Sequence, residues 1–348
     1  MKKSIIFFAC LLLLGANVVL GSDISKVGTS GAQFLKIGVG AQNIGKGEAV
    51  TASIGDITSV YWNPAGLANL NGSEISFTHT EWIAEINYDN IAYGFPLGSG
   101  VAGIFFGILS MPEFEETTVE EPEGTGVTFS CYDFVLGASY ARKITDRFSV
   151  GINTKFVRQV IWELSANGLA FDVGFQYATG FRSLRLGMSM TNFGTNMKYT
   201  GQQLKHEAQI YPGAPLTYED IPVNVESRGY PLPLLFRLGL AYNFLEDENN
   251  MLTVNLDGIQ PNDAREMGAF GLEYSYKKTF FARLGYQFCS QEGFAGRTGL
   301  GWDRYSRLTA GAGLVYKLSS KFNAKFDYAF ADFGLLESVH RFTLGLGF

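Results

Sequence analysis

The feature that most constrains the fold is a two-residue alternation of apolar and polar side chains along most of the chain. In residues 322–330 every second position is apolar, while Asn323, Lys325 and Asp327 lie between. The same alternation recurs at 236–244, 280–288 and 342–348. Successive side chains of a β-strand point to opposite faces, so this period predicts strands with one apolar and one polar face.

Applied to the whole chain, this period predicts fourteen strands. We expect them near 74–82, 86–95, 100–110, 129–142, 147–162, 166–178, 182–197, 232–244, 251–258, 267–277, 280–289, 307–317, 322–332 and 339–348. Closed single-chain bacterial barrels have an even number of strands when both ends lie on one side. We therefore predict an all-β fold, a 14-stranded antiparallel transmembrane β-barrel over residues 73–348.

The connections between these strands alternate in length. Short turns are expected on one side at 96–99, 143–146, 179–181, 245–250, 278–279 and 318–321. The other side has the longer connections 111–128, 198–231, 259–266, 290–306 and 333–338, together with two tight connections near 83–85 and 163–165. Short periplasmic turns and long external loops are typical of outer-membrane barrels. The pattern predicts a barrel in the cell outer membrane, surrounded by lipid, with both ends periplasmic.

The composition favours a membrane barrel over a soluble lipocalin-like barrel or sandwich. The chain contains 29 Phe, 17 Tyr and 42 Gly but only 10 Pro and 3 His. A soluble fold with this number of strands would have to bury too many large aromatic rings. It would also leave the aromatic-ended last strand, which finishes at Phe348, without an explanation.

The first residues resemble a secretory signal peptide. Lys2 and Lys3 precede a short apolar run, and small residues follow near Gly21. We expect a signal peptide over residues 1–21, with lipidation at Cys10 as the less favoured alternative. Cys131 and Cys289 would remain, either as a disulfide or, more in keeping with their places in or beside strands, as two free thiols.

The polar parity of the strands would line the interior of the barrel. The candidate lumen-lining charges are Lys155, Asp172, Arg185, Arg237, Glu273, Arg283, Asp327 and Arg341. Several positions of the same parity are glycine, at 137, 151, 174, 187, 271, 285 and 313, which leaves room for something inside. Paired charges and water are the favoured interpretation of this lumen, ahead of a specific ligand site.

Residues 22–72 precede the first strand and do not alternate. Asp56 is placed to cap a short helix near residues 57–62, and Pro64 ends it. This segment is too apolar for a disordered lead-in, so we expect a partly helical hatch that plugs the barrel.

The hatch region resembles a known family. The stretches FLKIGVGAQNIGKGEA (residues 34–49), DITSVYWNPAGLANL (56–70) and TEWIAEINYDNIAYGFPL (80–97) resemble the opening of PorV/PorQ proteins. The element formed by Asn63, Pro64, Ala65 and Gly66 is shared with the wider FadL-like barrels, which carry fourteen strands and an N-terminal hatch. One departure is 46–48 (Lys-Gly-Glu), which is charged where relatives are smaller and more apolar.

The two levels of this resemblance imply different functions. A PorV/PorQ protein would be a cargo-docking or shuttle component of the type IX secretion system, with cargo proteins and other secretion components as partners. A FadL-like protein would be a passive transporter of hydrophobic compounds, and Tyr211, Pro212, Tyr218 and Tyr230 would be candidate lining for the ligand. We take secretion as the main expectation and transport as the alternative.

Other classes of function have little support in the sequence. Its net charge of -6 gives nucleic acid no electrostatic attraction. We find no CxxC motif, histidine cluster or metal-ligand spacing, so we expect no metal and no cofactor. His79, His206 and His340 lie in different regions and form no Ser/His/Asp arrangement, so we do not expect an enzyme.

Overall fold

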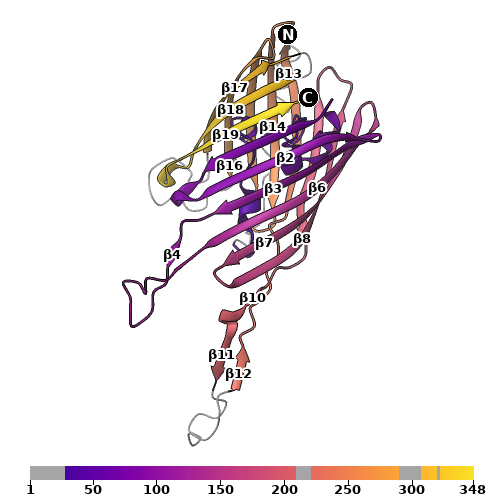
Figure 1. The fold of residues 1–348 in the computed structure, drawn as a ribbon. Coiled ribbons are helices and arrows are strands. Elements are labelled where there is room, and N and C mark those ends of the chain that lie inside the picture. The colour runs from indigo at the N-terminus through magenta and orange to yellow at the C-terminus, as the bar shows by residue number, and fades with distance from the viewer. Residues whose placement is uncertain (1–27, 209–220, 290–306, 320–321) are drawn as a thin grey trace, which may run out of the picture.

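In the computed structural model, fourteen antiparallel strands close into a barrel (Figure 1). The structure describes residues 28–208, 221–289, 307–319 and 322–348. The barrel strands are β1 (Glu74–Glu81), β2 (Asn87–Leu97), β3 (Gly100–Ser110), β6 (Cys131–Thr145), β7 (Phe148–Ile161), β8 (Leu164–Ala178), β9 (Arg185–Gly194), β13 (Leu235–Glu246), β14 (Asn250–Pro261), β15 (Met267–Tyr276), β16 (Phe280–Cys289), β17 (Arg307–Lys317), β18 (Asn323–Asp332) and β19 (Ser338–Gly347). Pairing of β1 with β19 closes the ring.

The predicted fold class is confirmed, with differences at single strand ends. β9 stops at Gly194, short of the predicted 197, because the β8–β9 register shifts and Asn192 adopts a left-handed φ of 64°. β13 begins at Leu235, after Pro231 and Pro233, because proline has no N–H to donate to a ladder.

The outer wall of the barrel is apolar along its whole circumference. Large side chains point outward and remain exposed, including Ile104 on β3, Leu238 on β13, Leu284 on β16 and Leu344 on β19. An apolar band of this extent is stable against lipid and unstable against water. The barrel is therefore an outer-membrane barrel, and the location predicted from the sequence is confirmed. No helix in the described ranges is long and apolar enough to span a membrane.

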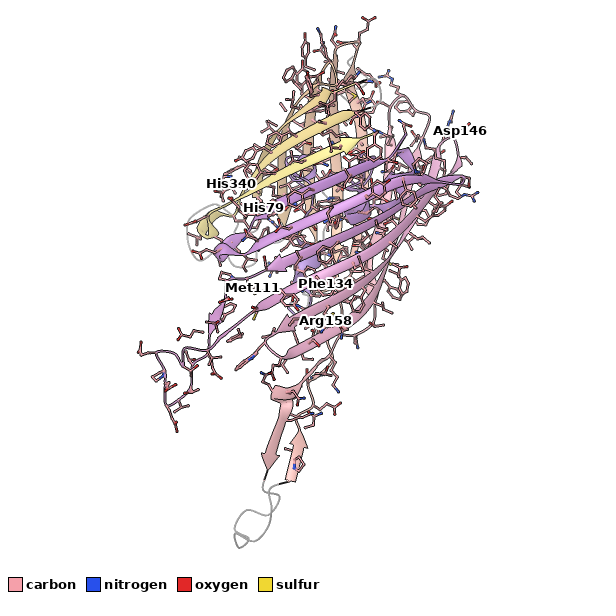
Figure 2. All side chains as sticks on the ribbon, in the orientation of Figure 1. His79, Met111, Phe134, Asp146, Arg158 and His340 are labelled. Carbon is pink, nitrogen blue, oxygen red and sulfur yellow. The ribbon has the colours of Figure 1, made fainter. Side chains whose placement is uncertain are left out.

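The two ends of the barrel differ. We call the end with short hairpin turns the turn end and the other the loop end; Asp146 and Met111 mark them in Figure 2. At the loop end β6, β7 and β8 extend furthest, and two small hairpins project beyond them (Figure 1). The hairpins are β4 (Phe114–Glu115) with β5 (Thr128–Phe129), and β11 (Lys205–Ala208) with β12 (Ile221–Asn224). A further short strand, β10 (Tyr199–Gly201), pairs with β8. Three short 3-10 turns are η3 (Ile83–Glu85), η4 (Gln202–Leu204) and η6 (Gly334–Leu336).

Residues 28–72 lie inside the barrel, and we call them the hatch. They form four short helices: η1 (Gln33–Lys36), α2 (Ala41–Ile44), α3 (Ser59–Trp62) and η2 (Pro64–Asn69). The described hatch starts at the loop end, where the Gly28 N–H donates to the Asp263 carbonyl, and finishes at the turn end, where Ser73 pairs with Phe348. The hatch thus runs along the length of the lumen.

Candidate functional site

The hatch can lie close to the wall because the wall positions nearest to it are glycines. A Cβ at Gly285 would lie 1.9 Å from the Gly47 nitrogen, and one at Gly187 would lie 2.2 Å from the Thr51 carbonyl oxygen. Further such positions are Gly151 and Gly174 against Asn63 and Pro64, Gly239 against Thr51, and Gly271 against Lys46. At five of the seven predicted lumen glycines the space is filled by the hatch, while Gly137 faces Phe105 and Gly313 faces Asp327 and Arg283.

One buried carboxylate of the wall holds the middle of the hatch. Asp257 on β14 accepts hydrogen bonds from the Val50 N–H (3.0 Å), the Thr51 N–H (2.9 Å) and the Thr51 hydroxyl (2.6 Å). Asp257 is 5% exposed. Hydrogen bonds to an ionised group are about twice as strong as neutral ones, so this residue fixes the turn at residues 50–51.

The charged departure at 46–48 is matched by charges on the wall. Lys46 lies 3.7 Å from Glu273, and Glu48 lies 3.6 Å from Arg237. Glu273 also accepts from Arg283 at 2.6 Å, and Arg283 donates on to Asp327 at 2.6 Å. Four of the predicted lumen-lining charges, Arg237, Glu273, Arg283 and Asp327, therefore belong to a network that includes the hatch.

The predicted hatch element ties α3 and η2 to β8. The Asn63 amide donates to the Thr51 carbonyl (2.7 Å) and to the Phe175 carbonyl of the wall (3.0 Å). Its side-chain oxygen accepts from the Ala65 N–H at 3.2 Å, which caps η2, and Pro64 occupies the first position of that helix. Pro64, Ala65 and Gly66 are all buried.

The remaining predicted lumen-lining charges lie outside this network and have other contacts. Lys155 pairs with Asp172 and donates to the Asn192 side chain, each at 2.7 Å. Arg185, near the turn end, donates to Asn243 at 2.8 Å. Arg341 stacks over Trp82, with 5.3 Å between guanidinium and ring, and its Nε and Nη1 have no hydrogen-bond partner within the described part of the chain.

A second acidic residue, which the sequence did not single out, anchors the hatch at the loop end. Asp263 accepts from Gln33 at 2.6 Å and from Lys36 at 3.0 Å, and its side chain is 1% exposed. It lies in the loop between β14 and β15, outside the alternating pattern that identified the wall charges. The only sequence signal was a loop carboxylate, which is common on any surface.

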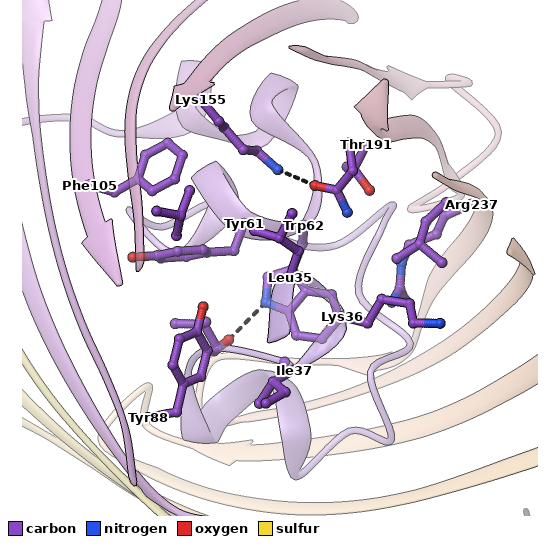
Figure 3. Close-up of a pocket in the computed structure, with 15 residues that line it drawn as sticks. Leu35, Lys36, Ile37, Tyr61, Trp62, Tyr88, Phe105, Lys155, Thr191 and Arg237 are labelled. Carbon is purple, nitrogen blue, oxygen red and sulfur yellow. Dashed lines mark hydrogen bonds between the residues drawn. The ribbon is translucent and has the colours of Figure 1, made fainter. Parts of the chain in front are cut away.

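A small cavity lies between the hatch and the loop-end part of the wall (Figure 3). Its volume is about 30 Å³. It is lined by Leu35, Lys36, Ile37, Gly38, Val39, Tyr61, Trp62, Tyr88, Phe105, Val135, Lys155, Thr191, Asn192, Leu235 and Arg237. An apolar cavity needs roughly 150 Å³ to hold benzene, so in this conformation the space fits water only.

The aromatic residues proposed as ligand lining have mixed outcomes. Tyr211, Pro212 and Tyr218 lie outside the described residues. Tyr230 contacts the hatch at Gly31 and donates to Gln159 at 3.0 Å, and it does not line the cavity. Burial raises the pKa of the Tyr230 hydroxyl, which keeps it a neutral donor.

The other reactive side chains lie elsewhere in the barrel. Cys131 is a free, buried thiol. His79 and His340 are on the outer wall, where they bond to Asp89 (2.6 Å) and Tyr328 (2.8 Å). Within the described ranges, His, Cys, Asp and Glu form no group that could hold a metal ion.

Comparison with known structures identifies the architecture. The toluene transporter TodX of Pseudomonas putida is similar, with a TM-score of 0.55 and 13% identity over 89% of this chain and 97% of that one. The monoaromatic hydrocarbon channel CymD gives a TM-score of 0.51 and 12% identity over 93% and 97%. No protein-family model and no curated protein sequence matches. The chain has the fold of FadL-like barrels.

These findings correct the main functional expectation. The resemblance of residues 34–97 to PorV/PorQ proteins predicted a role in type IX secretion, with cargo and secretion components as partners. TodX and CymD are instead named as a toluene transporter and a monoaromatic hydrocarbon channel. The short motif was misleading because the Asn63–Gly66 element serves a hatch, and a hatch is a property of the wider fold.

Proposed function

We propose that this chain is a passive outer-membrane channel for hydrophobic compounds, closed by its hatch. The observation that carries the proposal is the aromatic cavity between hatch and wall. Tyr61, Trp62, Tyr88 and Phe105 contribute rings to it, from α3, β2 and β3. Ligand sites combine aromatic and apolar walls with a few polar groups, and the lining of this cavity has that composition, although in the closed state its volume is only about 30 Å³.

Two cations of the cavity, Lys155 and Arg237, already have anionic partners, which favours an uncharged ligand, although the Arg237 Nη1 makes no hydrogen bond within the described part of the chain. Lys155 is held by Asp172 and Asn192, and Arg237 by Glu48 and by the face of Trp62 at 4.9 Å. A polar solute would have to compete with these partners. A hydrocarbon would contact only ring faces and aliphatic side chains, and monoaromatic hydrocarbons are what the similar barrels TodX and CymD are named for.

Passage requires the hatch to shift, because the cavity is smaller than a benzene ring needs. The hatch is held to the wall by hydrogen bonds and ion pairs rather than by continuous strand pairing. A ligand that binds the shifted state better than the closed one moves this equilibrium without any energy source. The hydrophobic compound would then cross the barrel down its own concentration gradient.

The test is uptake of labelled toluene by cells that lack the gene. We expect slower uptake than in the parent strain, restored by the native chain and not by a Phe105→Asp variant, whose carboxylate would enter the apolar cavity. Uptake of a small sugar should be the same in all strains. Folding of the variant is checked by the heat-dependent gel mobility of the barrel. Equal toluene uptake with and without the gene would refute the proposal.

A further inference from the structure

The exposed charges of the barrel are unequally distributed, with an excess of acids at the loop end and an excess of bases at the turn end. The loop end carries many exposed acids, among them Glu113, Glu115, Glu120, Glu121, Glu123 and Glu163. The turn end carries several exposed bases, among them Arg142, Arg147, Arg182, Lys277, Lys278 and Lys317. This unequal distribution has no role in the hatch or the cavity.

The basic side chains lie directly beyond outward-facing aromatic rings. On β6, Tyr140 and Arg142 share the outer face, and on β15 Tyr276 precedes Lys277. The two residues from Tyr140 to Arg142 correspond to about 6.6 Å along the strand, and Lys277 directly follows the last residue of β15, so both cations lie just outside the level of the rings. Aromatic rings prefer the membrane interface, which puts the cations at the depth of lipid phosphates.

Two contacts hold cations against this aromatic layer. Arg182, in the β8–β9 turn, donates to the Tyr242 hydroxyl at 3.3 Å. The Lys277 ammonium lies 5.3 Å above the ring of Tyr276. Arg147 packs over the same β8–β9 turn, at Gly180. The bases thus form two patches, one of Arg142, Arg147 and Arg182 and one of Lys277 and Lys278.

The turn end carries fewer exposed acids than exposed bases. Apart from Asp146, the described exposed acids there are Glu246, Asp247 and Glu248, in the turn between β13 and β14. Asp247 is engaged within that turn: the N–H groups of Asn249 and Asn250 donate to it and lower the pKa of its carboxyl. The acidic turn separates the two basic patches.

We propose that these two patches bind the anionic headgroups of phospholipids in the periplasmic leaflet of the outer membrane. Lipid fits the position better than a soluble partner does, because the cations border an apolar wall and an aromatic layer. A basic residue near an anionic membrane surface strengthens binding roughly fivefold. The Lys277–Lys278 patch alone should therefore favour phosphatidylglycerol over phosphatidylcholine by about 25-fold.

The experiment uses the full-length protein in nanodiscs of equal parts phosphatidylglycerol and phosphatidylcholine. The lipids that stay bound after extraction into neutral detergent are counted by native mass spectrometry. We expect phosphatidylglycerol to be enriched on the native protein. The triple variant Arg182→Gln, Lys277→Gln and Lys278→Gln should lose most of that enrichment, by about tenfold or more.

The matched control removes the same charge at the loop end, by Lys198→Gln, Lys205→Gln and Arg228→Gln. It should keep the enrichment, and both variants should show native heat-dependent gel mobility. The proposal is wrong if the native protein retains both lipids equally, or if the control loses as much phosphatidylglycerol as the turn-end variant. Neither result depends on whether the channel carries hydrocarbons.

Discussion

At the scale of single residues, Asp257 attaches the wall to the hatch through three hydrogen bonds. Replacing it by alanine removes three hydrogen bonds and leaves the buried N–H groups of Val50 and Thr51 without partners. We expect Asp257→Ala to destabilise the closed hatch by about 3 kcal/mol. Amides of residues 41–66 should then exchange with deuterium roughly a hundredfold faster, while strand amides keep their rates.

The control for this experiment is Asp146→Asn, at an exposed turn. It should leave exchange unchanged everywhere except in its own turn. Unchanged exchange of residues 41–66 in Asp257→Ala would mean that the hatch is held elsewhere.

Asn63 gives a second prediction at this scale. Asn63→Ala loses two carbonyl contacts, one of them to the wall, and the cap of η2. The hatch should loosen by about 2 kcal/mol. Cells that produce the variant should become more sensitive to a large hydrophilic antibiotic such as vancomycin. Asn249→Ala, in a turn, should behave like the native chain, and equal sensitivity of the two variants would contradict a role for Asn63 in closure.

The sequence could identify some of these residues but not their partners. Asp257 has the lumen-facing parity of its strand, and strand parity is a local property that can be read without the fold. Its bonds to residues 50–51 join positions about two hundred apart in the chain, and no local pattern encodes such a distance. Asp263 lies in a loop, where parity gives no information.

At the scale of elements, the strands were predictable because alternation is local and the lipid makes it unusually clean. The ends of β9 and β13 were not, because a bulge at Asn192 and prolines before Leu235 interrupt the ladder without changing the parity nearby. The hatch helices are four to six residues long, which is too short for a helical period to show in the sequence. Only Asp56 and Pro64 marked one of them, the helix expected near residues 57–62, which is α3 and has Thr58 as its N-cap.

The glycine positions of the wall give a prediction at this scale. Gly285→Val would place a side chain on the backbone of Gly47. The barrel should still assemble, since strand pairing is unaffected, but the hatch should no longer seat. Planar-bilayer recordings should show frequent openings that the native protein lacks.

Gly258→Val on β14 is the matched control, since a Cβ there meets nothing within 4 Å. It should conduct like the native protein. Openings of equal frequency in both variants would indicate a general loss of stability rather than displacement of the hatch.

At the scale of the whole molecule, the barrel and the hatch differ in how far apart in the sequence their contacting residues lie. The barrel closes through neighbouring strands, so its order follows the chain except at the junction of β1 and β19. The hatch crosses the lumen and contacts strands from all parts of the sequence. An even strand count and unequal connections predicted the barrel, while the course of the hatch depends on contacts that form only after closure.

The proposed function requires hatch and wall to move apart, and a reversible cross-link tests this in one molecule. A Cβ at Gly45 would lie 3.1 Å from the Gly311 Cα, and the reverse distance is also 3.1 Å. In a chain with its other cysteines replaced by alanine, Gly45→Cys and Gly311→Cys should form a disulfide that ties α2 to β17. We expect oxidised cells to take up toluene several-fold more slowly than the same cells after reduction. Each single-cysteine chain should be insensitive to reductant. Equal uptake before and after reduction would mean that hydrocarbons cross without movement of this part of the hatch.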